Sequence, residues 1–515
     1  MTAHKHIGKI VGVLMAAAVA FCLIVTLFAD RLVAVSGSSA ATMEYESTLF
    51  DTSEIMTVNI IMDEDQWQEL LDNAISEEYY ACDVEINGET ISNVGIRAKG
   101  NTSLSSIAND PDTDRYSFKI KFDKYVDGQT CMGLDKLVLN NNFADATNRK
   151  EALVYDMFQY LGADASLYNY AKISVNGEYW GTYLALEAVE DSFKLRNYGV
   201  SDGKLYKPET MGMGNDQKEE GSNLMDRPER PQGDFDQADM DEKFRNPQGG
   251  HDDFGSFGNR NGGADLNYVD DDADSYSTIW DGADGKVTDS DKERVVTAIK
   301  NINEGTDLTT YLDVDNILKY MAVHKFVVNL DSLSGNMTHN FYLYENDGQL
   351  NIIPWDYNLS FGGMTNGGMG GGPGRESTES SGATSMINDP IDTPFDGTDF
   401  FDALLENEEY LAQYHEYLRQ LAEEYVQGGR LQEVWERLDA QTDELIETDP
   451  TAFYTAAEYE EAKETLWTVL QLRAESVLGQ LDGTIPSTDD GQQNAQDTLI
   501  DGSAIDLSVM GEFNH

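Results

Sequence analysis

Apolar and polar positions divide the chain into a strand-rich first part and a helical second part. Residues 82–86 and 117–122 alternate apolar and polar side chains, a pattern that predicts strands with one buried face. Lys119 and Lys121 lie on the polar face of the second of these strands. Residues 410–425 instead repeat apolar side chains at helical spacing. The pattern therefore predicts an α+β fold.

A helix and a hairpin follow the first strands. Asn148 and Glu151 form a capping-box-like start to the helix. Two apolar runs between residues 170 and 186 are then separated by Asn176-Gly177, a dipeptide typical of a two-residue hairpin turn. Strands, helix, hairpin and an acidic connector also succeed one another in the N-terminal lobe of a protein kinase. By analogy, we expect residues 56–190 to form such a lobe.

Two low-complexity segments, residues 211–263 and 362–382, interrupt the later pattern. Both are rich in Gly and contain too few apolar side chains to offset the loss of chain entropy on folding. We expect them to be insertions in a helical C-terminal lobe, residues 191–482. Residues 483–515 are polar and acidic, and we expect a disordered tail there.

The N-terminus carries a candidate membrane segment, in which Lys5 and Lys9 precede an uncharged run at residues 11–28. As a helix rising about 1.5 Å per residue, this run spans about 27 Å, roughly the hydrocarbon thickness of a bilayer. We expect residues 1–30 to be a membrane anchor or signal segment and residues 31–55 to be a linker. The protein would then be a single-pass membrane protein with an extracytoplasmic domain, or secreted if the segment is cleaved.

The chain is strongly acidic, with 35 Lys and Arg against 93 Asp and Glu and a formal net charge of −58. Such a surface repels nucleic acid, which excludes a general binder of the phosphate backbone. The charge could favour divalent cations or basic substrates, although most of these carboxylates are expected only to be solvated.

Three cysteines occur in the sequence, and Cys22 lies within the apolar N-terminal run. Cys82 and Cys131 would therefore either pair with each other or remain as isolated buried thiols, and their spacing does not decide between these alternatives. No Cys or His cluster has the spacing of a structural zinc site.

The candidate catalytic and metal-binding residues follow a predicted helix at residues 315–328. Asp331 is followed five residues later by Asn336, and a predicted hairpin with a turn at Asp347-Gly348 leads to Asp356. In protein kinases a base Asp, a metal-binding Asn five residues later and a metal-binding Asp after a strand have the same layout.

On this interpretation, Asp331 orients and deprotonates an acceptor hydroxyl, while Asn336 and Asp356 hold Mg²⁺ or Mn²⁺ through oxygen. The flanking residues differ from those of ordinary kinases, because Asn-Leu-Asp replaces His-Arg-Asp and Trp-Asp-Tyr replaces Asp-Phe-Gly. Loop capping is the alternative role for Asp331 and Asn336.

A nucleotide would need contacts from the first part of the chain. The backbone of Gly100 and Asn101 could approach phosphates through N–H groups, because Gly lacks a Cβ atom. Glu187 and Glu190, after the predicted hairpin, could border an adenosine pocket; an exposed connector charge is the alternative for Glu190.

Lys119 and Lys121 are the candidates for a phosphate-binding lysine, with Lys136 as a third choice and Glu151 as the partner on the helix. The sequence does not choose among these lysines, and surface ion pairing is the alternative for each.

Several segments in order resemble the CotH kinase family, the spore-coat type of atypical protein kinase, across about residues 56–482. They are RAKGNTS at 97–103, GLDKLVLN at 133–140, VNGEYWGTYLALE at 175–187, LYK at 205–207 and PWDYNLSFG at 354–362. The resemblance implies a two-lobed kinase-like fold with a strand-rich N-lobe and a helical C-lobe. It also implies metal-dependent transfer of the ATP γ-phosphoryl group to proteins outside the cytoplasm, including autophosphorylation.

Two other classes of function compete with this hypothesis. A catalytically inactive cell-surface binding or scaffold protein could keep the same fold without transferring phosphate. An acidic calcium-binding protein is the other, but the Asp-rich residues 265–291 do not have the spacing of an EF-hand loop.

Overall fold

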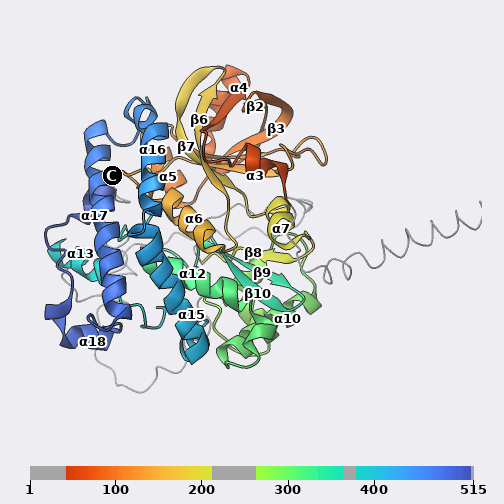
Figure 1. Cartoon of the computed structure of the whole chain (residues 1–515). Helices are drawn as coiled ribbons and strands as arrows, with labels where there is room; N and C mark the ends of the chain where they lie inside the picture. The colour runs from red at the N-terminus through yellow and green to blue at the C-terminus, as the bar shows by residue number, and fades with distance from the viewer. Residues whose placement is uncertain (1–41, 211–261, 336, 364–378, 512–515) are drawn as a thin grey trace, which may run out of the picture.

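Seven strands in the first part of the chain close into a barrel (Figure 1). The computed structural model describes residues 42–210, 262–335, 337–363 and 379–511. The barrel has the order β1-β2-β3-β4-β5-β7-β6, and β6 also pairs in parallel with β1. Its strands are β1 (Met56–Ile61), β2 (Tyr80–Ile86), β3 (Glu89–Lys99), β4 (Ser117–Lys121), β5 (Lys136–Asn140), β6 (Tyr168–Val175) and β7 (Glu178–Glu187).

The alternation in the sequence determines which side chains fill this barrel. Phe118 and Ile120 of β4 are fully buried in the barrel core, whereas Lys119 and Lys121 on the opposite face are partly exposed. The predicted strands at residues 82–86 and 117–122 are therefore confirmed. So is the hairpin of β6 and β7, in which Asn176 and Gly177 have φ values of 51° and 85°, as a two-residue turn of this kind requires.

Short helices precede or connect the barrel strands, and one longer helix contacts both the barrel and the rest of the molecule. They are α3 (Glu44–Thr48), α4 (Glu64–Asp72), η1 (Ala74–Ser76), α5 (Thr102–Ala108) and α6 (Lys150–Leu161). The helix α6 contacts both β6 and the later helix α12 (Val314–Val327). It therefore lies between the barrel and the helical part of the molecule (Figure 1).

The start of α6 differs from the prediction. Asn148 does not cap the helix, because it adopts a left-handed conformation with φ of 51° and its side-chain oxygen accepts a hydrogen bond from Asn142. Instead a carboxylate oxygen of Asp145 accepts the backbone N–H groups of Arg149 and Lys150. The capping oxygen thus belongs to Asp145, which precedes the predicted capping box of Asn148 and Glu151. The helix ends at Gly162, which is left-handed with φ of 68°.

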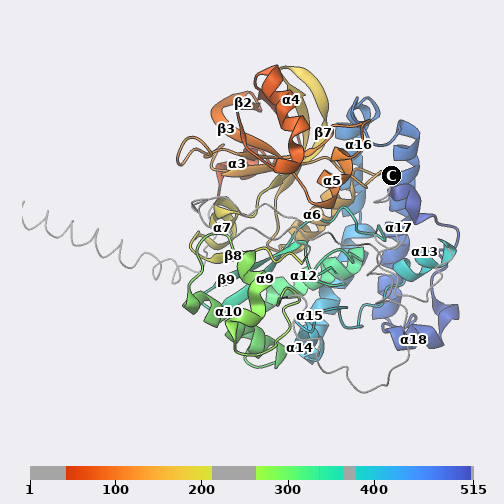
Figure 2. The same ribbon diagram turned by 180° about the vertical axis from the view of Figure 1, so that it is seen from behind.

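The second part of the chain combines a small antiparallel sheet with helices. The strands have the order β10-β9-β8, and α7 lies between this sheet and the barrel in both views (Figures 1 and 2). The further elements are α7 (Asp191–Tyr198), β8 (Lys204–Tyr206), η3 (Ala273–Tyr276), α9 (Ser277–Asp281), α10 (Asp289–Asn303), α11 (Leu308–Tyr311), β9 (Phe341–Asn346), β10 (Gln349–Pro354), α13 (Glu379–Ile387), α14 (Asp402–Leu405), α15 (Glu408–Arg419), the π-helix η4 (Gln420–Val426), α16 (Arg430–Glu447), α17 (Ala456–Leu481), α18 (Asp489–Asn494), η5 (Gln496–Thr498) and η6 (Leu507–Met510).

Buried apolar residues form two clusters, one inside the barrel and a larger one among the helices and the small sheet. Val138, Leu184 and Leu186 belong to the larger cluster although they lie on barrel strands. They therefore point out of the barrel and join its outer face to the helical part.

The sequence analysis predicts an α+β fold with two kinase-like lobes. The structure confirms the α+β class, but its strand-rich part is a closed barrel and does not by itself define a kinase lobe. The closure arises from the pairing of β6 with both β1 and β7. Hydrophobic alternation shows which face of a strand is buried, but not which strands pair.

The C-terminal segment also differs from the prediction of disorder. Residues 483–511 include α18 and η6, and Leu507 and Met510 are buried. Ala146 donates its backbone N–H to the carbonyl of Met510, at 3.1 Å. These apolar residues are too widely spaced to give a periodic signal, so their burial depends on the surface of α17 that they pack against.

The two low-complexity segments lie mostly outside the described residues. The second overlaps α13, which begins at Glu379. Cys82 and Cys131 are free, buried thiols, which resolves the open pairing question.

The predicted location in a membrane needs correction. Within the part of the chain that the structure describes, no helix is both long and apolar enough to cross a bilayer. The run at residues 11–28, on which that prediction depends, lies outside the described residues. We therefore do not retain the membrane-anchored, extracytoplasmic location.

Candidate active site

Two loops bring Asp331 and Asp356 to the same part of the molecule. Asp331 follows the end of α12 and is largely buried, with its backbone N–H donating to the side-chain oxygen of Asn329 at 3.3 Å. Asp356 follows β10 and is partly buried. Burial raises the pKa of Asp356, and the negative charge of Asp331 adds to this rise, whereas the charge of Lys99 opposes it.

The backbone is left-handed at several non-glycine positions around these loops. Val328, Thr338, Asn340, Asp356 and Phe361 all have φ values between 46° and 61°. Val328 and Thr338 are β-branched, and such residues rarely adopt this conformation. Conformations of this kind cost about 1–3 kcal/mol each and cluster at functional sites. The loops are therefore held in conformations that the surrounding packing must stabilise.

Two neighbouring side chains hold the carboxylate of Asp331. His339 Nε2 lies 3.0 Å from Oδ1, and Asn340 Nδ2 donates to Oδ2 at 3.0 Å and to the backbone carbonyl of Asp331 at 2.9 Å. Burial disfavours the imidazolium form, but the hydrogen bond and charge of Asp331 outweigh it and raise the pKa of His339.

Glu151 on α6 adds a third carboxyl group to this region. Burial, and after it the charge of Asp356, raises the pKa of Glu151 to about 8. Glu151 Oε2 accepts a hydrogen bond from Asn140 at 2.8 Å, whereas the buried Oε1 makes no hydrogen bond among the described residues.

Lys99 supplies a positive charge to the site, a role that the sequence analysis missed. It is the last residue of β3, its Nζ donates to Asn140 Oδ1 at 2.9 Å, and it lies 5.8 Å from the ring centre of Trp355. Its charge opposes the shifts that burial causes in the pKa of Asp356 and of Glu151. The amide of Asn140 therefore links Lys99 to Glu151.

The structure places Lys119 and Lys121 near Glu190, in the connector after β7. Burial opposes ionisation of Glu190, but the charges of Lys136, Lys119 and Lys121 outweigh it and lower the pKa of Glu190. Lys136 Nζ lies 2.5 Å from Glu190 Oε1. These three lysines thus gather at the connector after β7, and the helix residue Glu151 interacts with Lys99. The position of Lys99 directly before Gly100-Asn101 is the sequence signal that could have identified it.

Gly100 and Asn101 form the turn between β3 and α5. Gly100 has φ of 136°, and a Cβ atom at this position would lie 2.9 Å from Ser103 Oγ and 3.2 Å from Leu104 Cβ. Asn101 stands at the N-cap position of α5 without a side-chain capping bond. The turn thus requires glycine, and it follows directly from Lys99.

Glu187 has a structural set of partners. Its carboxylate accepts hydrogen bonds from Tyr45 Oη at 2.6 Å, from Arg196 at 2.5 and 3.0 Å, and from the backbone N–H of Leu167 at 3.1 Å. Through these hydrogen bonds Glu187 connects the barrel to α3 and α7.

A metal ion requires oxygen ligands, and the site offers some of them. Asp356 and Glu151 would contribute carboxylate oxygens. Among the described residues, however, no group of three or more His, Cys, Asp or Glu side chains forms a complete metal site. Asn336, the other predicted ligand, lies outside the described residues. Mg²⁺ is commonly held by one or two carboxylates together with substrate phosphates, so an all-protein cage is not required.

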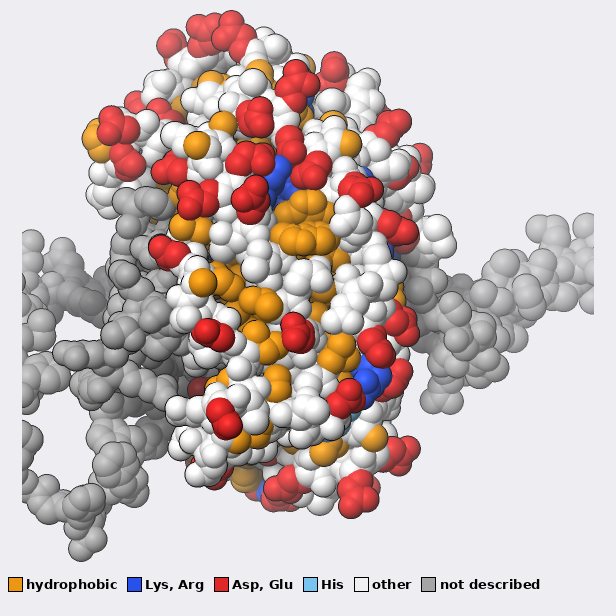
Figure 3. All heavy atoms as spheres, turned by 60° about the vertical axis from the view of Figure 1, so that its left-hand side comes forward, with side chains coloured by type: hydrophobic (Ala, Val, Ile, Leu, Met, Phe, Trp, Pro, Cys, Tyr) orange, Lys and Arg blue, Asp and Glu red, His pale blue; other side chains and the backbone are white. Residues whose placement is uncertain are grey.

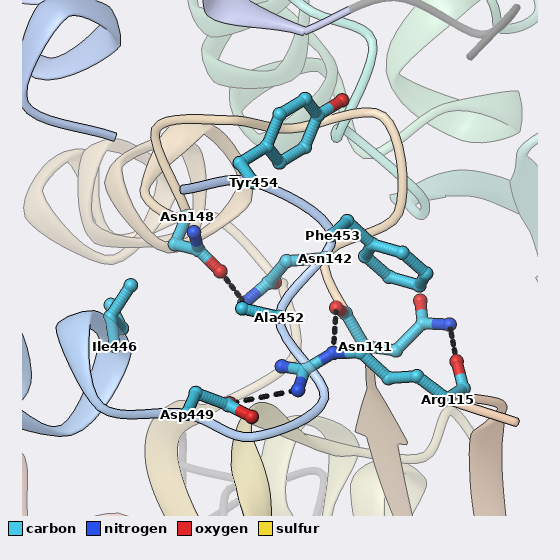
Figure 4. A pocket seen from close by; sticks show the side chains of 9 residues that line it. All are labelled: Arg115, Asn141, Asn142, Asn148, Ile446, Asp449, Ala452, Phe453 and Tyr454. Carbon is cyan, nitrogen blue, oxygen red and sulfur yellow. Dashed lines mark hydrogen bonds and ion pairs between the residues drawn. The ribbon is translucent and has the colours of Figure 1, made fainter. Parts of the chain in front are cut away.

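A small pocket lies where the barrel meets the helices, and its lining does not include Lys99, Glu151, Asp331 or Asp356. Its lining is Arg115, Asn141, Asn142, Asn148, Ile446, Asp449, Ala452, Phe453 and Tyr454 (Figure 4). Arg115 forms an ion pair with Asp449 at 2.8 Å and donates to the carbonyls of Asn141 and Thr182. These bonds join the barrel to the segment after α16, so we interpret the pocket as part of the packing interface between the barrel and the helices.

Comparison with known families identifies the family of the chain. The CotH kinase protein family matches residues 96–477, which is most of the chain and includes Lys99, Glu151, Asp331 and Asp356. The chain belongs to the CotH kinase family. No curated protein matches it.

Proposed function

We propose that this protein is a metal-dependent atypical protein kinase that transfers the γ-phosphoryl group of ATP to a hydroxyl group of a protein. The observation that carries the proposal is the convergence of three segments: Lys99 at the end of β3 lies 5.8 Å from the ring centre of Trp355, the residue before Asp356, and the charges of Lys99 and Asp331 both act on Asp356. Phosphoryl transfer needs a cation beside the phosphates, a positive side chain and a carboxylate near the acceptor. In this proposal the barrel is the N-lobe and the helices with the small sheet are the C-lobe.

Each residue has a separate task in the transfer. Asp331 accepts the proton of the acceptor hydroxyl as the new O–P bond forms, while the bond from the γ-phosphorus to the leaving oxygen of ADP breaks. Lys99 binds phosphate oxygens, and the turn at Gly100 and Asn101 brings backbone N–H groups toward them. Asp356, with Asn336, would hold the divalent cation, Mg²⁺ or Mn²⁺, which supplies neutralisation of phosphate charge.

The remaining predicted contacts also belong to this proposal. Lys119 and Lys121 remain candidates for contacts to ATP at the connector where Glu190 lies. Glu187 supports that connector through Arg196. Glu151 positions Lys99 through Asn140.

We further propose that the protein substrate is basic. The formal net charge is −58, and the face in Figure 3 carries many Asp and Glu side chains but few Lys or Arg. Long-range attraction would raise the rate of encounter with a positively charged partner, and salt would weaken that attraction.

A radiolabelled ATP assay tests the proposal, with the full chain, Mg²⁺ or Mn²⁺, and a basic acceptor protein. Asp331→Asn should keep ATP affinity and lose transfer by about 10²-fold or more, because a base acts mainly in the transition state. Asp356→Asn should lose both metal-dependent ATP binding and transfer. Glu433→Gln is the control, since Glu433 is 77% exposed on α16.

The outcomes separate the two functional classes. ATP binding that requires the cation, with transfer that depends on Asp331, supports the kinase. A wild-type protein that neither binds ATP nor transfers phosphate would favour a binding or scaffold role on the same fold.

A further inference from the structure

Two consecutive side chains converge on one carboxylate, an arrangement that regular backbone does not produce. In an extended strand His339 and Asn340 would point to opposite sides. The flanking residue Thr338 and Asn340 itself are left-handed, with φ of 46° and 59°. This bend lets His339 Nε2 reach Oδ1 of Asp331 and Asn340 Nδ2 reach Oδ2, each at 3.0 Å.

We propose that His339 is a positioning residue that fixes the carboxylate of Asp331 toward the acceptor hydroxyl. The inference rests on the proposed kinase function. An ionised carboxylate has about four lone-pair positions, and the two side-chain contacts use one on each oxygen. The carboxylate can then no longer rotate freely, yet each oxygen retains a lone pair for the acceptor proton.

His339 and Asn340 contribute differently to this arrangement. Asn340 also binds the backbone carbonyl of Asp331, so its replacement would disturb the loop itself. The side chain of His339 contacts the carboxylate of Asp331, and a hydrogen bond with the backbone of Met337 also favours its protonated form. A change at His339 therefore leaves the bond between Asn340 and the backbone carbonyl of Asp331 in place.

The charges around His339 support the same role. Asp331 faces it from its own loop, and Asp356 faces it from the segment after β10. Two carboxylates on one imidazole favour its protonated form. A positive His339 holds the carboxylate of Asp331 more strongly than a neutral imidazole would, because the contact is then charge-assisted.

A matched pair elsewhere in the chain provides the control. His415 Nε2 lies 2.6 Å from Asp392 Oδ1, on the surface of α15 and away from the candidate site. Both pairs join an imidazole to an aspartate, but only the first involves the proposed base. Loss of His415 should therefore leave transfer unchanged.

The experiment compares His339→Gln, His339→Leu and His415→Leu with the wild-type full chain in the ATP assay. Gln keeps an N–H donor of similar reach, whereas Leu removes it. We expect His339→Leu to lower kcat about 10- to 100-fold, the range expected when a reacting group is misplaced, with the KM for ATP unchanged. His339→Gln should recover most of this loss. The kcat profile of the wild-type enzyme should show an inflection above pH 6.5, the ordinary pKa of His, that is absent in His339→Gln.

The results distinguish this inference from the proposed function. An inactive wild-type chain overturns the kinase proposal and, with it, the role of His339. An active wild type with an equally active His339→Leu overturns only the positioning role, and so does a Gln variant that loses as much activity as Leu. If His339→Leu fails to fold, the pH profile of His339→Gln decides, because an unchanged inflection contradicts the proposal.

Discussion

The carboxyl groups of Glu151 and Asp356 interact electrostatically across the candidate site. Burial, and then the charge of Asp356, raises the pKa of Glu151 to about 8 from an ordinary value of 4.5. The pKa of Asp356 is also raised, and the positive charge of Lys99 reduces the rise in both carboxyl groups without cancelling it. Near neutral pH the pair therefore retains a proton that a bound cation would replace.

The protonation of Glu151 should make stability depend on pH. Between about pH 4.5 and 8 the folded protein holds this proton while the unfolded chain has released it, so the contribution to stability falls as pH rises. We expect the free energy of unfolding of the wild type to fall, relative to that of Glu151→Gln, across this range. Urea unfolding without metal at both ends of the range measures the difference. A constant difference would contradict the shared proton.

Lys99 should be essential for nucleotide binding. Lys99→Met removes the positive charge with the largest effect on Asp356 and should raise the KM for ATP about 10- to 100-fold, as expected for the loss of a hydrogen bond between charged groups. Lys286→Met, at an exposed position, is the matched control. Lys119→Met measured in the same assay shows which lysine serves the phosphates. A larger effect of Lys119→Met would reverse our assignment.

The turn at Gly100 should not tolerate a side chain. In Gly100→Ala the new Cβ atom would meet Ser103 Oγ at 2.9 Å, and φ of 136° is unfavourable for alanine. We expect a loss of stability of about 1–3 kcal/mol together with weaker ATP binding. Gly128→Ala is the control, because Gly128 is also left-handed, with φ of 70°, but has no atom within 4 Å of its Cβ position. Equal effects of the two substitutions would argue against a tight turn.

The C-terminal segment should stabilise the folded protein. Met510 is 1% exposed and packs in the larger hydrophobic cluster, so Met510→Ala should cost about 2–5 kcal/mol. Gln493→Ala, at an exposed position of α18, should change stability by less than about 0.5 kcal/mol. Chemical unfolding of both variants checks this, and a neutral Met510→Ala would restore the prediction of a disordered tail.

Local signals in the sequence were sufficient for several elements. The alternation at Phe118 and Ile120 predicted the buried face of β4, and Asn176-Gly177 predicted the turn of the hairpin. These features depend on neighbours in the chain, which a single sequence contains. The capping of α6 failed as a prediction because Asp145, outside the expected pattern, supplies the oxygen.

The sequence by itself determined the α+β class, the resemblance to the CotH kinase family and the order of Asp331 and Asp356 along the chain. Only the tertiary structure decided that Lys99, rather than Lys119 or Lys121, accompanies Glu151. Lys99 ends β3, and Lys119 and Lys121 lie on the neighbouring strand β4, so the local sequence does not separate them. Their partners depend on how β3, β4 and β5 pair and where α6 packs, and burial and charge then set the pKa values of the carboxyl groups they meet.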